Sequence, residues 1–315
     1  MSKFNFKIIE KKNLWFLISI IIITVGIGSM ILRGINNQPI LNYGIDFIGG
    51  QSMLLNLQDM ENLPNDHTTI IKNIRTILEP YQLDKSSIQL IPDTSASGKK
   101  TLSLLIKMLK LNNETSQSLL TDISNVVGPI EVLEIDYIGA TIGSELRKTS
   151  FTIILVVSLC LLLYISFRFK LSYGLSALCA LIHDALITIS FASIFNLEIN
   201  TAFVAAILTI LGYSINDTIV IFDRVREYFH KFKKTQTINN IINLALNDTL
   251  IRTINTSLTT LLVLLSLIYF GGSTTKQFCT ILLIGVLAGT YSSLFIASPV
   301  LVKLHPEITE EENDE

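Results

Sequence analysis

The residues best placed to do chemistry are ionisable side chains inside long apolar stretches. Asp217 lies in the run GYSINDTIVIFDR, near the end of a stretch long enough to cross a bilayer. An ionised carboxylate deep in a membrane helix costs roughly 2.5 to 3.5 kcal/mol on insertion scales, so such groups commonly serve proton or ion handling. We therefore expect Asp217 to be the centre of function.

A second polar cluster opens the next apolar stretch, which begins LIRTINTSLTT. Arg252, Asn255 and Thr256 line one face there, and Asn216 precedes Asp217 in the stretch before it. If the two helices pack, Arg252 is a candidate partner for Asp217. Burial and a nearby cation have opposing effects on a carboxyl group, and this competition permits a proton-dependent switch. The alternative is a static buried ion pair that fixes helix register.

His183 and Asp184 are the other strongly ionisable residues well inside a predicted span. A histidine here can relay a proton or simply hydrogen-bond a neighbour, and the sequence leaves both roles open. Asp184 and Asp217, on successive helices, could also be the dyad of an intramembrane aspartyl protease, which must share a proton across about 3 Å. Nothing beside either aspartate resembles a substrate gate, so we expect no catalytic residue and no enzyme.

Missing signatures narrow the chemistry further. The chain has neither a G-x-x-x-x-G-K-[ST] phosphate loop nor an H-E-x-x-H metal helix. We expect no ATP hydrolysis by this chain, no cofactor and no metal. A formal net charge of −2 argues against nucleic acid as a partner. Any work must therefore come from binding energy, a partner or an ion gradient.

The composition is that of a membrane protein, because 49% of the 315 residues are hydrophobic and only 16% are charged. The first long apolar run is treated as an anchor, since no small-residue cleavage site follows it. All three cysteines fall inside predicted spans, so no disulfide is implied. Runs long enough to cross about 30 Å of hydrocarbon occur at 14–32, 150–167, 173–195, 200–222, 253–271 and 277–301.

Lysine and arginine gather on one side of these spans, which identifies the cytoplasmic side. They precede the first span, follow the second and lie between the fourth and fifth, whereas the opposite loops hold Glu198 and Lys276. Both termini are therefore expected in the cytoplasm. The expected parts are an N-terminus with the first helix at 1–32, an extracytoplasmic domain at 33–149, a five-helix bundle at 150–304 and an acidic cytoplasmic tail at 305–315.

Between the first two spans, the hydrophobic pattern changes to that of short strands and helices. Their order, strand, helix, strand, strand, helix, strand, is the split β-α-β pattern of ferredoxin-like α+β domains. The predicted fold is therefore a membrane protein of six transmembrane α-helices, with a ferredoxin-like extracytoplasmic domain between the first and second. We place the strands at 51–57, 87–91, 101–107 and 130–137 and the helices at 67–79 and 114–126.

Three local patterns give further expectations about packing. On the fourth span, Thr209 and Asn216 belong with Asp217 to a small and polar stripe that should face other helices. Residues 237–250 are typical of a separate amphipathic helix on the inner membrane surface or against a partner. Gly285 and Gly289 form a small-xxx-small pair suited to close helix approach.

Six motifs, in order along the chain, resemble one known family. They are GIDFIGG, IGATIGSELRK, LIHDALITISF, GYSINDTIVIFDRVRE, TLIRTINTSLTTLL and GTYSSLFIASP. Together they are similar to SecF, in the SecD/SecF family of protein-export membrane proteins within the resistance-nodulation-division superfamily. By motif, Asp217 matches the family's proton-linked aspartate and Arg252 its membrane arginine. His183 and Asp184 match a familiar pair of less settled role.

The resemblance implies a subunit that forms a heterodimer with a SecD-like subunit and uses the proton motive force to assist late steps of protein translocation. The further partners that it implies are the SecYEG channel, the translocating preprotein and a YajC-like small membrane protein. It implies a bacterial plasma (inner) membrane, with a thylakoid membrane as the alternative. Coupling to H⁺ or to Na⁺ stays open, and so does a small-molecule efflux subunit of the same superfamily.

Overall fold

The computed structural model describes residues 6–57, 67–83, 86–94, 100–271 and 273–304. The predicted acidic tail at 305–315 lies outside the described residues. The chain divides into two compact units. Among the described residues, one unit, the membrane unit, is formed by residues 6–42, 150–271 and 275–304, and the other, the sheet unit, by those between 43 and 149 with 273–274.

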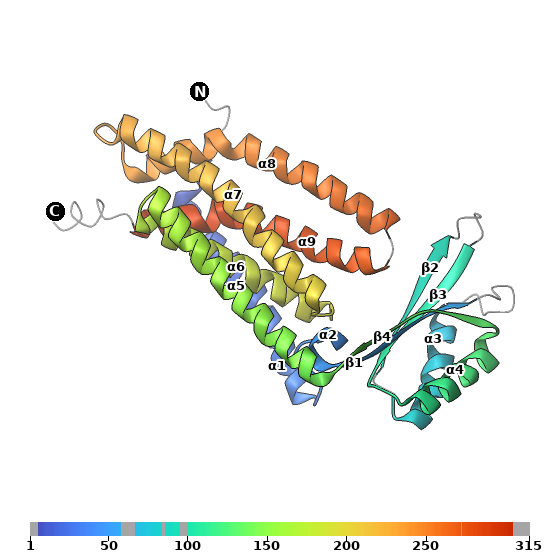
Figure 1. Cartoon of the computed structure of the whole chain (residues 1–315). Coiled ribbons are helices and arrows are strands. Elements are labelled where there is room, and N and C mark those ends of the chain that lie inside the picture. The colour runs from blue at the N-terminus through green and yellow to red at the C-terminus, as the bar shows by residue number, and fades with distance from the viewer. Residues whose placement is uncertain (1–5, 58–66, 84–85, 95–99, 272, 305–315) are drawn as a thin grey trace. The chain divides into compact units, whose positions relative to one another are not determined.

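Within the described residues, six helical segments are long and apolar enough to cross a membrane, which confirms the six predicted spans. The last segment contains a π-helical turn at Ser293–Ala297, between two α-helical parts. Figure 1 shows the segments, which are α1 (Lys12–Ile35, preceded by a 3-10 turn at Ile9–Lys11), α5 (Ala140–Arg168), α6 (Leu171–Ile194), α7 (Thr201–Phe232), α8 (Ile238–Phe270) and α9 (Ser273–Ser292) with α10 (Ser298–Leu304).

Three helices, α5, α7 and α8, extend at one end about ten residues or more beyond the hydrophobic runs that predicted them. Helix α5 begins at Ala140 rather than at 150. The polar residues that precede the apolar run are compatible with a helix outside lipid. The helix expected at 237–250 is present, with Ile241, Ile242 and Ala245 buried, but it is the first part of the continuous helix α8. Its buried Asn243 and Asn247 are satisfied by the N-terminal segment, where each side-chain oxygen accepts from backbone N–H groups at 2.8 to 3.1 Å.

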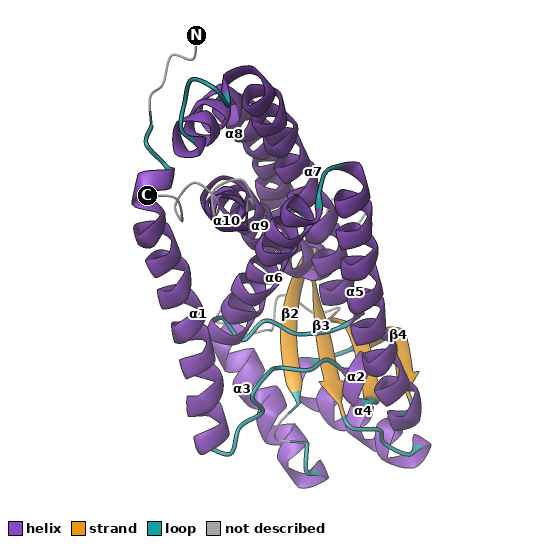
Figure 2. Cartoon of the chain, turned by 90° about the vertical axis from the view of Figure 1, so that its left-hand side faces the viewer, coloured by secondary structure: helices purple, strands orange, loops and turns teal. Residues whose placement is uncertain are grey.

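Helix α6 is at the centre of the membrane unit. It packs against α1, α7, the π-helical turn and α10, and Figure 2 shows it between α1 and α7. Small residues permit the close contacts. A Cβ atom at Gly26 of α1 would lie 2.3 Å from the Ser190 Cβ of α6, and one at Gly289 of α9 would lie 2.9 Å from the Ser214 Cβ of α7. The close approach expected of Gly289 is therefore confirmed.

The sheet unit has the predicted order of elements. They are β1 (Gly50–Leu57), α3 (His67–Leu78), β2 (Ser87–Thr94), β3 (Lys100–Met108), α4 (Asn113–Val127) and β4 (Ile130–Ile138). The strands form one antiparallel sheet in the order β2-β3-β1-β4. Helices α3 and α4 cover one face, where Met53, Leu55 and Ile106 pack against Ile74 and Leu119 to form the core (Figure 1).

A short helix, α2 (Ile45–Ile48), was not predicted. It lies within GIDFIGG and ends at Gly49, whose φ of 77° is in the left-handed region. A Cβ atom there would lie 2.6 Å from the Ala140 Cα, so both the conformation and the space require glycine. This part of the motif therefore joins the first strand to the start of α5.

Candidate functional site

Asp217 lies on the inner side of α7 and is only 4% exposed. Its Oδ2 atom has no hydrogen-bond partner among the described residues. A buried polar atom without a partner is costly, so each such atom in a folded protein calls for an explanation. One oxygen of the Asp217 carboxyl group is thus buried without a hydrogen-bond partner among the described residues.

Helices α7 and α8 pack together, as the predicted pairing of Asp217 with Arg252 requires. The described residues form no direct ion pair between Asp217 and Arg252. The structure therefore does not contain a static ion pair between Asp217 and Arg252 that would fix the register of α7 against α8. Arg252 itself is exposed on the surface of the isolated chain.

The supporting polar residues fall into two groups. Asn216 and Asn255 are exposed, whereas Thr256 is half-buried and donates to the backbone carbonyls of Arg252 and Thr253 at 3.1 and 2.9 Å. The stripe expected on α7 is therefore divided within this chain, because Asp217 is buried whereas Thr209 and Asn216 are exposed. Successive helical residues differ by about 100° in direction, so Asn216 cannot share the inward direction of Asp217.

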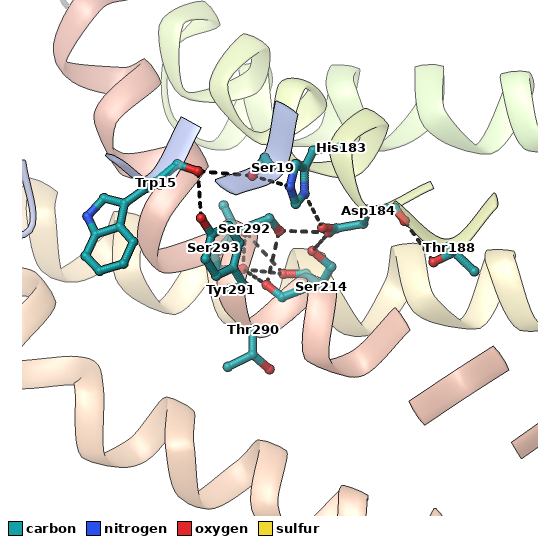
Figure 3. A network of polar contacts seen from close by, with 12 residues as sticks. Trp15, Ser19, His183, Asp184, Thr188, Ser214, Thr290, Tyr291, Ser292 and Ser293 are labelled. Atoms are coloured by element: carbon teal, nitrogen blue, oxygen red, sulfur yellow. Dashed lines mark hydrogen bonds and ion pairs between the residues drawn. The ribbon is translucent and has the colours of Figure 1, made fainter. Parts of the chain in front are cut away.

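A buried network surrounds Asp184, which is 0% exposed (Figure 3). Its Oδ2 atom accepts from the hydroxyls of Ser214 and Ser292 at 2.6 and 2.8 Å, and its Oδ1 atom lies 3.0 Å from Nδ1 of His183. The other imidazole nitrogen of His183 lies 2.9 Å from the hydroxyl of Ser19 on α1. One carboxyl group thereby connects α6 with α7 and α9 directly, and with α1 through His183.

The π-helical turn continues this network toward Asp217. The hydroxyl of Ser293 contacts that of Thr218 at 2.8 Å and donates to the carbonyl of Ser214 at 3.3 Å. Tyr291 stacks on the His183 ring with centroids 5.9 Å apart, and its hydroxyl donates to the Trp15 carbonyl at 2.7 Å. Figure 3 shows these side chains converging from separate helices. The segment that carries Asp217 is thus held from two sides.

The two aspartates therefore differ in what they can do. Asp184 has its acceptor atoms filled, which suits a fixed junction or a proton relay through His183 to Ser19. Asp217 has a free buried oxygen, which suits a group that changes its protonation state. No hydrogen bond joins the two carboxyl groups among the described residues, so the geometry of an aspartyl protease dyad is not formed.

Several residues of the network escaped the sequence analysis, among them Ser19, Ser214, Ser292 and Tyr291. A hydroxyl inside an apolar run is common, because it can bond the carbonyl one turn earlier. The sequence did hold one indication of these hydroxyls: a buried His183 and a buried Asp184 each need hydrogen-bond partners. Within the described residues, no group of three or more histidine, cysteine, aspartate and glutamate side chains could hold a metal ion.

Comparisons with known proteins agree with this architecture. A family model described as protein export membrane protein SecD/SecF, C-terminal, matches residues 119–307. The protein translocase subunit SecF of Sebaldella termitidis is 35% identical over 300 residues, which are 95% of this chain and 92% of the relative. That of Desulfurispirillum indicum is 36% identical over 308 residues, covering 93% of this chain and 90% of the relative.

Two solved structures of SecDF also match nearly the whole of this chain. The crystal structure of SecDF from Thermus thermophilus, described as a translocon-associated membrane protein, matches 96% of this chain with a TM-score of 0.79 and 29% identity. SecDF in a super-membrane-facing form matches 100% of this chain with a TM-score of 0.70 and 29% identity. This chain spans only 39% and 40% of those two longer chains.

Proposed function

Because the chain belongs to the SecD/SecF family of protein-export membrane proteins, we propose that it is a SecF-like subunit that couples the proton motive force to late steps of protein translocation. The observation that carries this proposal is the buried Asp217 with its unpartnered oxygen. A carboxyl group of this kind can gain and lose a proton without first breaking a hydrogen bond at that atom. A positive charge such as that of Arg252 and burial act in opposite directions on a carboxyl group, which is the competition that a proton-dependent switch requires.

A SecD-like subunit is the proposed partner within the membrane. Polar side chains are exposed along α7 and α8 inside the candidate spans, namely Thr209, Asn216, Arg252, Asn255 and Thr259. Lipid cannot satisfy a guanidinium or an amide, so such groups normally face protein or a water-filled cavity. The match to about two fifths of the SecDF chains also supports a second subunit that supplies the rest.

The proposed arrangement places both termini in the cytoplasm of a bacterial plasma (inner) membrane, with a thylakoid membrane as the alternative. The sheet unit then lies on the far side, where a preprotein emerges from the SecYEG channel. Protonation changes at Asp217 shift the helices, and the sheet unit moves with them. A YajC-like small membrane protein belongs to the same proposed assembly.

We propose that the two carboxyl groups serve a role other than that of an aspartyl protease. An aspartyl protease needs its aspartates to share a proton. Asp184 instead accepts from Ser214 and Ser292. The relatives are named translocase subunits, which also supports an accessory role.

The test replaces Asp217 with Asn in the intact complex and measures gradient-dependent export in vesicles. Asn keeps the size of the side chain but cannot ionise, so we expect gradient stimulation to be lost while the complex still assembles. Asp223→Asn is the matched control, because Asp223 is an exposed aspartate on the same helix. Unchanged stimulation in Asp217→Asn would refute the coupling role.

Two related experiments distinguish H⁺ from Na⁺ as the coupling ion, and protein export from small-molecule efflux. Stimulation by a sodium gradient without a proton gradient would assign Na⁺ as the coupling ion. Accumulation of a toxic solute on deletion, with normal protein export, would instead indicate an efflux subunit.

A further inference from the structure

The segment that leads into the first membrane helix, residues 6–10, is bound by α8, which is distant in the sequence. The side-chain amide of Asn247 binds both backbone groups of Phe6. Its Oδ1 atom accepts from the Phe6 N–H group at 2.8 Å, and its Nδ2 group donates to the Phe6 carbonyl at 2.9 Å. One side chain therefore pairs with this N-terminal segment much as a neighbouring β-strand would.

Asn243, about one helical turn before Asn247, binds the next part of the segment. Its Oδ1 atom accepts from the N–H groups of Ile8 and Ile9 at 3.0 and 3.1 Å. Its Nδ2 group donates to both carboxylate oxygens of Glu10, at 3.1 and 2.9 Å. The 3-10 turn that begins at Ile9 has no side-chain cap from its own N-cap residue, so Asn243 supplies that cap from another helix.

The two amides that bind the segment are buried. Asn243 and Asn247 are only 8% and 4% exposed, and the two isoleucines of the segment are buried as well. Residues four apart lie on one face of a helix, so both amides face the segment together. Asn239 and Asn240, in the first turn of the same helix, are exposed. A buried amide is costly without hydrogen-bond partners, so the segment and the start of α8 stabilise each other.

The segment also connects α8 with the buried polar network. It continues into α1, where the Trp15 carbonyl accepts from the Tyr291 hydroxyl at 2.7 Å. One turn later, the Ser19 hydroxyl lies 2.9 Å from Nε2 of His183 (Figure 3). The indole N–H of Trp15 donates back to the Ile8 carbonyl at 3.1 Å. The first turns of α8 are thus joined through α1 to the helices that carry this network.

Arg252 lies on α8 between two such attachments. It follows Asn247 by about one and a half turns, or roughly 7 Å along the helix axis. Beyond Arg252, the Ser257 hydroxyl contacts that of Thr290 on α9 at 2.6 Å. Besides α7, the described elements that pack most against α8 are the 3-10 turn before α1 and α10. The position of Arg252 along α7 therefore depends on how the N-terminal segment holds the start of α8.

Resting on the proposed function, we infer that the N-terminal segment is a clamp that holds the start of α8 through Asn243 and Asn247 and thereby positions Arg252 for coupling. The two asparagines are positioning residues, because they act through α8. Without the clamp, α8 keeps its contacts with α7 but is free to tilt at this end. The guanidinium group would then no longer be held at one level relative to Asp217, so coupling would fall although the complex is assembled.

Hydrogen exchange measures the clamp directly. The intact chain is compared in nanodiscs, in complex with the SecD-like subunit. In Asn243→Ala combined with Asn247→Ala, we expect the amides of residues 6, 8 and 9 to exchange about tenfold faster, since each loses its acceptor. Asn239→Ala with Asn240→Ala is the matched control, because both are exposed asparagines of the same helix. Equal exchange of these amides in the two double variants would overturn the inference.

A reversible covalent clamp separates positioning from folding. Phe6→Cys with Asn247→Cys is made in a chain whose native cysteines are replaced by alanine. Because Asn247 binds both backbone groups of Phe6, we expect this pair to form a disulfide on oxidation. The oxidised complex should retain gradient-dependent export in vesicles, and reduction of the same preparation should lower the stimulation about fivefold.

Phe6→Cys alone is the control for the redox treatment, since it keeps Asn247 and its side chain is 52% exposed in the native chain. Its export should not respond to reduction. Folding and assembly are complete before the disulfide is reduced, so a merely structural role would leave export in the cysteine pair unchanged. Failure of the pair to form a disulfide, or equal stimulation before and after reduction, would overturn the inference.

The clamp and the proposed function fail separately. Asp217→Asn in the cysteine pair should abolish gradient stimulation in both redox states while the disulfide still forms. Stimulation that is lost in Asp217→Asn but does not respond to reduction in the pair would reject the clamp and retain the coupling role. Unchanged stimulation in Asp217→Asn, with the amides of residues 6, 8 and 9 still protected, would reject the coupling role and leave only the contact.

Discussion

At the residue scale, Asp184 and Asp217 show two solutions to the burial of a carboxyl group. Asp184 receives two serine hydroxyls and an imidazole nitrogen, so its hydrogen bonds offset the loss of water. Asp217 keeps a buried oxygen without any such contact in the described structure. An arrangement that is unfavourable for stability is expected where a group must change state, which is why Asp217 remains the better functional candidate.

Asp184→Ala tests the junction role. The change would leave the hydroxyls of Ser214 and Ser292 and the ring of His183 without their acceptor, so we expect a loss of about 3 kcal/mol in unfolding free energy. Reversible unfolding of the chain in detergent measures the loss. The exposed Asp223→Ala should change stability by no more than about 0.5 kcal/mol. Equal losses for the two variants would argue against the junction.

The sequence predicted the types of the site residues better than their contacts. Asp217 and Arg252 stood out because ionisable residues are rare inside apolar runs. Ser214 and Ser292 did not stand out, since hydroxyls are ordinary in apolar runs. Only the packing of α7 and of the end of α9 against α6 brings them to Asp184. Chain spacing gives direction around one helix, but it does not say which helix lies opposite.

At the element scale, the π-helical turn at Ser293–Ala297 marks the point where the last span meets α7. A π-helical turn shifts the register of the residues that follow, and such turns are frequent at functional sites. Here Ser292 and Ser293, at its start, bond Asp184 and Thr218. The turn therefore positions two adjacent hydroxyls toward two different helices.

Gly289→Ala tests the close contact on which this arrangement depends. A Cβ atom there would lie 2.9 Å from the Ser214 Cβ and 3.3 Å from its Cα, so the helices must separate. We expect a destabilisation of about 1 to 3 kcal/mol from overpacking, measured by unfolding in detergent. Gly212→Ala on α7 is the control, because nothing lies within 4 Å of its added Cβ. A neutral Gly289→Ala would show that the contact is loose.

The order of the helices and strands could be predicted from the sequence, but the residues at which some helices begin or end could not. Hydropathy locates lipid-compatible runs, and those were found at all six spans. Helix α8 begins well before its apolar run, because Asn243 and Asn247 are buried through hydrogen bonds with residues more than two hundred positions away. Such long-range partners leave no local pattern.

At the scale of the whole molecule, the chain combines a helical membrane unit with a sheet unit that has its own hydrophobic core. The proposed coupling requires that these units lie on defined sides of the membrane. The assignment depends on basic residues such as Lys231 in the last turn of α7 and Lys233 and Lys234 between α7 and α8, which favour the cytoplasm. This assignment can be tested directly with cysteine labelling.

The labelling experiment starts from a chain in which Cys160, Cys179 and Cys279 are replaced by alanine. Gln117→Cys on α4 and Thr235→Cys between α7 and α8 then place single thiols at exposed positions. Because positive charge is retained on the cytoplasmic side, a membrane-impermeant maleimide should label Gln117→Cys in intact cells and Thr235→Cys only after permeabilisation. The reverse pattern would invert the topology and place the sheet unit in the cytoplasm, where it could not meet an emerging preprotein.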